Sequence, residues 1–366
     1  MADDVGNADV GNADVGNPGA ANPRWKQRPE GSTWGDFGPD DELGRINLLT
    51  PEKVRQGAAE VKEGISFGLS IPLDYPGGRV LNPRRGPPEL SPTLRMGKAN
   101  MNFPLRKENG HSTDVVCDDQ VLLTLQYSTQ WDSLAHVGAW FDADGDGKPE
   151  MVYYNGYRAN VDVVGPVIHH DDHEEACGAH LGALKLSIAN FAAKPIQGRG
   201  VMLDFFAHFG LQRRALSYDD VQRVIDADRI EIETGDLLVM RTGYTRLIMQ
   251  MDRNPDIAKL DAVAMGLDGR DERLLQWITD SGIAAICADN YAVEFYPPRD
   301  LPGATPHLPL HQHCLFKLGV PLGEIWWLDD LGEWLRANQR SRFLLTAPPL
   351  RLPGAVGSPV TPVATV

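Results

Sequence analysis

The chain has 366 residues, of which 42% are hydrophobic and 23% charged, and its formal net charge is −15. This composition is typical of a globular protein, and the negative charge argues against nucleic acid or an anionic membrane surface as a partner. No run of about 18 apolar residues occurs, so no transmembrane helix is expected. The N-terminus lacks the pattern of a secretory leader and the four cysteines are scattered, so we expect a cytoplasmic protein with reduced thiols.

The sequence predicts three parts. Residues 1–24 contain the repeat Asn-Ala-Asp-Val-Gly at 7–11 and 12–16, and they have too few apolar side chains to fold, so they are predicted to form a disordered tail. Residues 25–345 are predicted to form a single domain. Residues 346–366 are rich in Pro and Val without a pattern, and we expect an extended C-terminal tail that could pack on a neighbouring subunit.

The first predicted helix follows Thr50, an N-cap with Pro51 at the first helical position, and ends near Gly64. Apolar and polar residues alternate over 65–73, which predicts a strand. Residues 74–112 are rich in Pro, Gly, Arg and Asn and show little periodicity. Long loops of this kind are often functional. This one could be a substrate lid or an oligomer arm, or a mere surface insertion.

The apolar run at residues 121–125 predicts a core strand, which would lead into the loop Thr-Gln-Trp-Asp-Ser-Leu-Ala-His at 129–136. Loops held by a rigid scaffold are where sites tend to be built. Asp132 and His136 place a carboxylate and an imidazole four residues apart in this loop. This pairing suits a metal ligand beside a general base.

Two further stretches have the composition of metal sites. Asp142, Asp144 and Asp146 resemble the opening of a calcium loop, but Tyr153 stands where the twelfth-position Glu belongs, and an acidic hairpin turn is the alternative. Residues 169–175 are dense in His, Asp and Glu, which would allow a second metal site. They would equally suit the start of a solvated helix continuing over residues 176–191, whose apolar residues have helical spacing.

The second half of the chain alternates between predicted strands and helices, which indicates an α/β fold. Buried strands are expected at 200–204, 235–243 and 282–290, with a capped helix after Ser217 and another over 271–281. A helical turn holding His311 then leads through Gly319 into a short strand that ends at Glu324. His311 and Glu324 are therefore expected at the same end of the fold.

Several motifs in this order resemble one known family. The residues concerned are Trp34-Gly35, Gly38-Pro39-Asp40-Asp41-Glu42-Leu43-Gly44, Thr129–His136, Tyr154-Asn155-Gly156-Tyr157, Gly198-Arg199-Gly200-Val201, Gly235-Asp236, Arg241-Thr242-Gly243, Ala288-Asp289-Asn290, His311 and Gly323-Glu324. Together they resemble the cyclase family, which includes bacterial kynurenine formamidases and isatin hydrolase-like enzymes.

This resemblance implies an α/β fold with the β/β/α swivelling-domain architecture typical of the cyclase family, and a divalent-metal hydrolase that opens amides, lactams or similar bonds. The family motif is H-x-G-T-H-x-D-x-P-x-H. By the resemblance, Asp132, His311 and Glu324 bind metal and His136 is catalytic. This chain departs from the motif where Gln126 and Gln130 replace its two early histidines; Ser128 and Leu134 also replace its Gly and Pro.

The two glutamines have a physical consequence. Glutamine offers a neutral carbonyl oxygen where the family motif has an imidazole nitrogen, which lowers zinc affinity and favours harder ions. We therefore expect one divalent ion, with manganese favoured over zinc, held by Asp132, His311 and Glu324 together with Gln130. Two metal ions are not expected without the early histidines.

The leading hypothesis is hydrolysis of an amide or lactam C–N bond of a small substrate, with His136 as general acid and base. Trp34, Trp131 and Phe141 would line an apolar pocket for a cyclic or aromatic substrate, or else pack in the core. One alternative is a lactonase, lyase or dehydratase on the same metal site; another is an inactive binding protein that keeps the fold. The resemblance also implies a homo-oligomer.

Overall fold

The computed structural model describes residues 24–169, 173–176 and 182–366. The predicted disordered tail, apart from Arg24, therefore lies outside the described residues. Within them, no helix is both long and apolar enough to cross a membrane.

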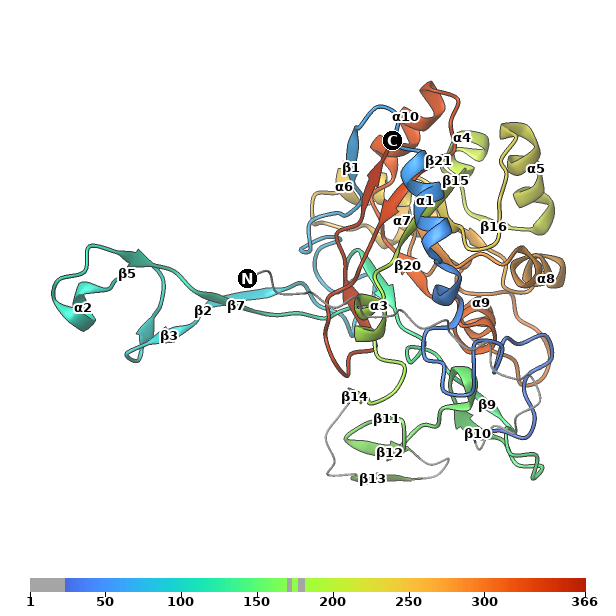
Figure 1. Ribbon diagram of the computed structural model, residues 1–366, viewed down its shortest axis with the longest axis horizontal. Coiled ribbons are helices and arrows are strands. Elements are labelled where there is room, and N and C mark those ends of the chain that lie inside the picture. Colours follow the sequence, from blue (N-terminus) through green and yellow to red (C-terminus); the bar gives the residue numbers. More distant parts are fainter. Residues whose placement is uncertain (1–23, 170–172, 177–181) are drawn as a thin grey trace, which may run out of the picture.

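A mixed sheet of nine strands forms the centre of the described chain (Figure 1). Its order is β1-β23-β21-β15-β17-β19-β20-β8-β22; neighbours from β15 to β20 run parallel and the remaining pairs antiparallel. This arrangement confirms the α/β class. The strands are β1 (Ser66–Gly68), β8 (Gln130–Asp132), β15 (Gln197–Asp204), β17 (Leu237–Arg241), β19 (Ala285–Ala288), β20 (Leu322–Glu324), β21 (Arg342–Thr346), β22 (Gly357–Pro359) and β23 (Val363–Thr365).

Helices pack around this sheet, and two of the predicted helix starts are confirmed. Thr50 caps α1 by accepting a hydrogen bond from the Lys53 amide at 3.3 Å, and Ser217 and Asp220 form a capping box on α5. Helix α1 lies against β15 and β21. The helices are α1 (Pro51–Ala59), α2 (Arg106–Asn109), α3 (Ala189–Ala193), α4 (Phe205–Phe209), α5 (Tyr218–Asp228), α6 (Tyr244–Gln250), α7 (Ile257–Ala262), α8 (Glu272–Ser281), α9 (Pro309–His311) and α10 (Asp329–Ala337), with the 3-10 helices η1 (Gly44–Leu48) and η2 (Tyr154–Gly156) and the π-helix η3 (Gln312–Leu318).

A long arm, residues 89–122, projects from the body (Figure 1). It consists of β2 (Glu89–Pro92), β3 (Leu94–Arg95), β4 (Lys98–Ala99), β5 (Phe103–Pro104), α2, β6 (Val115–Val116) and β7 (Asp119–Leu122). The core strand predicted at 121–125 is wrong, because Val121 and Leu122 belong to β7 and are 50% and 72% exposed. An apolar run predicts a strand but does not say what covers it. The buried strand at this point of the chain is β8, which carries Asp132 itself.

Four smaller strand pairs flank the sheet. They are β9 (Ala139–Phe141) with β10 (Glu150–Val152), β11 (Val163–Val164) with β14 (Gly182–Ala183), β12 (Val167–His169) with β13 (Glu174–Ala176), and β16 (Arg214–Leu216) with β18 (Met265–Leu267). The helix predicted over residues 176–191 is therefore wrong in its described part. Only α3 is helical there, and Leu186 has a left-handed φ of +60° that a continuous helix cannot contain.

The C-terminal residues 346–366 are extended, as predicted, but they lie in the domain's own sheet. Strand β23 pairs with β1 and β21, and β22 pairs with β8. Ala364 and Val366 are fully buried. The segment predicted as a tail thus completes the sheet and braces the strand that holds Asp132.

Asp236, one of the shared motif residues, holds α1 to the sheet. Its buried carboxylate accepts hydrogen bonds from the Arg199 guanidinium at 2.9 and 2.7 Å, from the Lys53 ammonium at 2.9 Å and from the Glu233 amide at 2.7 Å. Breaking such a buried pair by removing one partner costs about 3–5 kcal/mol. These motif residues therefore stabilise the fold.

Candidate metal centre and active site

Strands β8 and β20 place three polar side chains on one face of the sheet. Side chains alternate along a strand, so Gln130 and Asp132 share a face of β8 while Trp131 points to the other. The antiparallel register sets Glu324 opposite Gln130. All three polar residues are at least 97% buried.

His311 reaches the same cluster from the helical turn α9. The chain continues through η3 and Gly319 into β20, as the sequence predicted. The imidazole Nε2 of His311 lies 3.2 Å from Oε1 of Glu324 and 3.9 Å from Oδ2 of Asp132. One ligand atom from each of Asp132, His311 and Glu324 lies within 4.8 Å of the others. We call these three residues with Gln130 the metal cluster.

Glu294 orients His311, and the sequence reasoning missed it. Its carboxylate accepts a hydrogen bond from Nδ1 of His311 at 2.6 Å and from the backbone amides of Leu310 and His311 at 3.1 and 3.2 Å. A proton held on Nδ1 leaves Nε2 as the atom that can bind metal. The available signal was a glutamate set in an apolar sequence shortly after the buried strand β19.

Replacing Glu294 tests this orienting role. We expect Glu294→Gln to weaken metal binding about 10- to 100-fold, as loss of a carboxylate behind a histidine ligand commonly does. The exposed Glu272→Gln is the matched control. A chelator-competition titration measures both affinities, and equal affinities for the two variants would contradict the role.

Backbone strain adjoins two of the three carboxylates of this region, Glu294 and Glu324. Val293, just before Glu294, has a φ of +57°, and Ile325, just after Glu324, has a φ of +58°. Left-handed backbone is rare for β-branched residues and costs of order 1–3 kcal/mol at each position. The fold therefore tolerates strain on the residues that aim these two carboxylates.

Two members of the metal cluster, Asp132 and His311, hold their protons strongly when no ion is bound, whereas the hydrogen bond and the charge of His311 lower the pKa of Glu324. Burial, and then the neighbouring Glu324, raise the pKa of Asp132 to about 8. Burial by itself would lower the pKa of His311, but hydrogen bonds to Glu294 and Glu324 raise it to about 10. The cluster is thus short of positive charge, and because a metal ion must displace these protons, its binding strengthens as pH rises.

Two buried oxygen atoms of the cluster have no hydrogen-bond partner among the described residues: Oε1 of Gln130 and Oδ2 of Asp132. The Gln130 amide nitrogen lies 3.1 Å from Oε2 of Glu324 and 3.5 Å from Oδ1 of Asp132. Unsatisfied buried oxygens are costly, and a cation held by Asp132 would satisfy its Oδ2; the oxygen of Gln130 would face the same ion only with its amide group turned over. The donor set of two carboxylates, one imidazole and one amide oxygen therefore fits a divalent metal ion.

His136 stands at the edge of the cluster. Its Nε2 lies 3.8 Å from Oδ1 of Asp132, its ring centroid lies 6.4 Å from that of His311, and its side chain is 19% exposed. Burial, and then the charge of His311, lower the pKa of His136 to about 4. The imidazole is therefore neutral near pH 7 and able to accept a proton.

The three aromatic residues predicted to line a pocket pack in the core. Trp34 and Trp131 are fully buried, and their indole N–H groups donate to the carbonyls of Phe316 and Ala347 at 2.7 and 2.8 Å. Phe141 is partly buried and packs edge-on against Trp34. This placement matches core packing, the alternative stated for them, because two of the three present no exposed surface.

The acidic loop at 142–146 forms the turn between β9 and β10. Asp142, Asp144 and Asp146 lie close enough to share an ion. The carboxylate of Asp142, however, already accepts hydrogen bonds from the amides of Gly145, Asp146 and Gly147 at 2.8 to 3.0 Å. These contacts are those of an acidic hairpin turn.

The second predicted ligand cluster, at 169–175, falls partly on residues 170–172, which lie outside the described residues. His169 and Glu174 face each other across β12 and β13 and form an exposed pair at 3.0 Å. They belong to a strand pair and not to the predicted helix start.

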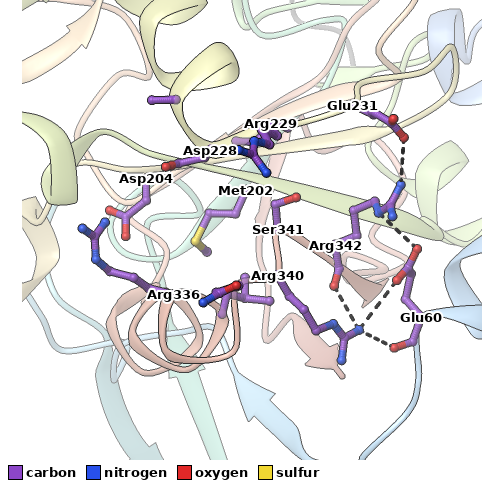
Figure 2. Close-up of a pocket in the computed structure, with 15 residues that line it drawn as sticks. Glu60, Met202, Asp204, Asp228, Arg229, Glu231, Arg336, Arg340, Ser341 and Arg342 are labelled. Atoms are coloured by element: carbon purple, nitrogen blue, oxygen red, sulfur yellow. Dashed lines mark hydrogen bonds and ion pairs between the residues drawn. The ribbon is translucent and has the colours of Figure 1, made fainter.

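A cavity of about 230 Å³ adjoins Glu294, with Asn290 and Tyr291 in its wall and residues 80–84 opposite. A cavity of about 690 Å³ lies elsewhere, near the ends of α5 and α10 (Figure 2). Its wall is charged, and Arg342 pairs there with Glu60 and Glu231 at 3.4 and 3.3 Å. None of the four metal-cluster residues lines either cavity. Glu294, which orients His311, lines the cavity of about 230 Å³, so this cavity is the candidate substrate space.

Comparisons with known proteins identify the family of this chain. The model of the Cyclase family matches residues 67–295, which is more than half of the chain. The chain belongs to the cyclase family. The matched range includes Asp132, His136 and Glu294, whereas His311 and Glu324 follow it. A search of curated proteins finds no match.

Solved structures of cyclase-family proteins share the fold. One, described as a novel cyclase, is 30% identical, covers 92% of this chain and 99% of its own, and has a TM-score of 0.70. Isatin hydrolase A from Labrenzia aggregata, bound to benzyl benzoate, is 13% identical, with coverage of 86% and 97% and a TM-score of 0.51. Isatin hydrolase A from Ralstonia solanacearum is 15% identical, with the same coverage and TM-score. The expected family architecture is thereby confirmed.

Proposed function

We propose that this cyclase-family protein is a metal-dependent hydrolase that cleaves an amide or lactam C–N bond of a small substrate. The observation that carries the proposal is a buried cluster, short of positive charge and with unsatisfied oxygens, beside the neutral imidazole of His136. Metal-dependent hydrolysis of such bonds requires a cation that activates water and a nearby side chain that accepts a proton.

Asp132, His311, Glu324 and Gln130 would hold the ion. When bound there, a divalent ion lowers the pKa of water and polarises a carbonyl group. His136 accepts a proton from the attacking water and returns it to the leaving nitrogen. Glu294 keeps a proton on Nδ1 of His311, and the nearly complete burial of the cluster strengthens every electrostatic interaction within it.

We further propose that manganese is preferred to zinc, because Gln130 offers an oxygen where the family motif has a nitrogen. Gln130→His should reverse this preference by supplying an imidazole beside Asp132. The expected result is a gain in zinc affinity relative to manganese, measured by competition titration of both ions. The control is Gln120→His, which places a histidine at an exposed position on β7. An unchanged preference in Gln130→His would show that Gln130 is not a ligand.

The substrate is proposed to occupy the cavity beside Glu294, Asn290 and Tyr291. Its partly aromatic wall suits a small cyclic or aromatic molecule. Screening amides and lactams with the manganese-loaded enzyme in water labelled with heavy oxygen tests the reaction class. Hydrolysis places the heavy oxygen in the carboxylate product, whereas product free of the label would indicate elimination and contradict the proposal.

A further inference from the structure

Arg85 brings a positive charge close to the metal cluster. Its side chain is half-buried, and its Nη1 donates a hydrogen bond to the backbone carbonyl of Gln126 at 2.8 Å. The side chain of Gln126 lies against Gly357, and Gly357 pairs with Asp132 across β22 and β8. This chain of contacts places Arg85 on the Asp132 side of the cluster.

A second chain of contacts leads from Arg85 to Glu324. The Cζ atom of Arg85 lies 5.9 Å from the ring centroid of Tyr291. The preceding residue, Asn290, accepts a hydrogen bond at its carbonyl from the amide of Ile325 at 3.1 Å, and Ile325 directly follows Glu324. Arg85 is therefore held between the segments that carry the two metal-cluster carboxylates.

The charge of Arg85 acts on the groups of this site. Burial is the largest influence on the pKa values of Asp132, His136 and Glu324, and the guanidinium of Arg85 lowers the pKa of all three. A nearby cation stabilises a carboxylate and disfavours an imidazolium, so these directions agree with the position that the contacts give to Arg85.

Arg85 lacks an anionic partner in the part of the chain that the structure describes. No carboxylate there forms an ion pair with it, and its N–H groups other than the one bound to Gln126 have no acceptor. Tyr291 is its neighbour and also lines the cavity of about 230 Å³. The Tyr291 hydroxyl accepts a hydrogen bond from Nδ2 of Asn82 at 3.2 Å, which leaves its own hydrogen free to be donated. A charged planar donor and a hydroxyl donor therefore stand together beside the candidate substrate space.

We propose that Arg85, together with the hydroxyl of Tyr291, binds a carboxylate group of the substrate. The substrate class is then a small amide or lactam that carries a carboxylate in addition to the bond that is cleaved. The guanidinium fork matches a carboxylate with two parallel hydrogen bonds, a geometry that fixes the orientation of a bound molecule. This inference rests on the proposed hydrolase function and adds the charge of the substrate to it.

Matched pairs of amides, each with and without a carboxylate, test the proposal. One pair is N-acetylanthranilate and acetanilide, and binding is measured by titration calorimetry on the manganese-loaded protein in a His136→Ala background, which prevents turnover. We expect the carboxylate members to bind at least about 10-fold more tightly than the neutral members, and Arg85→Gln to remove this preference. Arg79→Gln removes the same charge from an exposed position of the same loop and should keep the preference.

Kinetics with the His136-containing protein separate this inference from the proposed reaction. For a pair that is hydrolysed, Arg85→Gln should lower kcat/KM of the carboxylate member about 10- to 100-fold, mainly through KM, and leave the neutral member unchanged. An equal loss of kcat for both members would overturn the inference, because it would place Arg85 at the reacting carbonyl. No preference for carboxylates across the panel would also overturn it and leave the hydrolase function standing. Tighter binding of carboxylates that depends on Arg85, without cleavage of any pair, would support the inference and contradict the proposed reaction.

Discussion

Replacing Asp132 with asparagine is expected to lower metal affinity by more than about 100-fold and to abolish turnover, because the change removes a charged ligand from the centre of the cluster. Burial disfavours the ionised carboxylate of Asp132, as its raised pKa shows. The metal-free variant should therefore be at least as stable as the metal-free wild type. Added manganese should stabilise only the wild type, by about 2.7 kcal/mol at 100 times its Kd. Metal analysis and thermal melts measure both effects.

Asp289→Asn is the matched control for Asp132. Asp289 is also fully buried with a raised pKa, about 7, but its carboxylate accepts hydrogen bonds from the Thr242 and Gly243 amides at 2.7 Å. We expect this variant to lose stability and keep its metal. Metal retained in Asp132→Asn, or lost equally in both variants, would contradict the role assigned to Asp132.

His136→Ala is expected to keep the metal ion and lose turnover by about 100- to 10,000-fold, the usual contribution of a general acid and base. The separation of the two effects follows from geometry, since His136 stands at the edge of the cluster while Asp132, His311 and Glu324 form its centre. Metal content and kcat on any substrate found in the screen measure the split.

Two further measurements sharpen the assignment of His136. Free imidazole should restore part of the activity of His136→Ala, because a small base can enter the space left by the side chain. His208→Gln, which removes a histidine paired with Asp228 at 2.8 Å, should leave turnover unchanged. Full activity of His136→Ala without imidazole would remove His136 from the mechanism.

Short sequence patterns predicted which polar residues come together in the candidate site, but they did not predict the strands that pair around it. The sequence predicted that His311 and Glu324 lie at the same end of the fold. This prediction was possible because only a helical turn, one glycine and a short strand separate the two residues. Asp132 and His136 were found together because they are neighbours in sequence. The partner strand of Asp132 was not predicted, since β8 pairs with β20 and β22, whose residues lie about 190 or more positions further along the chain.

Residues whose role depends on tertiary packing were missed or misplaced. Glu294 acts only because a loop brings it against His311, and no spacing in the sequence reveals that contact. Trp34 and Trp131 are residue types that often line pockets, but in this fold they are buried in the hydrophobic core. The apolar run at 121–125 predicted a core strand because exposure on an arm cannot be distinguished from burial by hydrophobicity alone.

The most direct test of the metal centre is a crystal structure of the manganese-loaded protein, with diffraction measured at the manganese absorption edge. We predict an anomalous peak in contact with the carboxylates of Asp132 and Glu324 and with Nε2 of His311. A peak at the acidic turn of Asp142, Asp144 and Asp146 with none at the cluster, or no peak under saturating manganese, would contradict the metal centre proposed here.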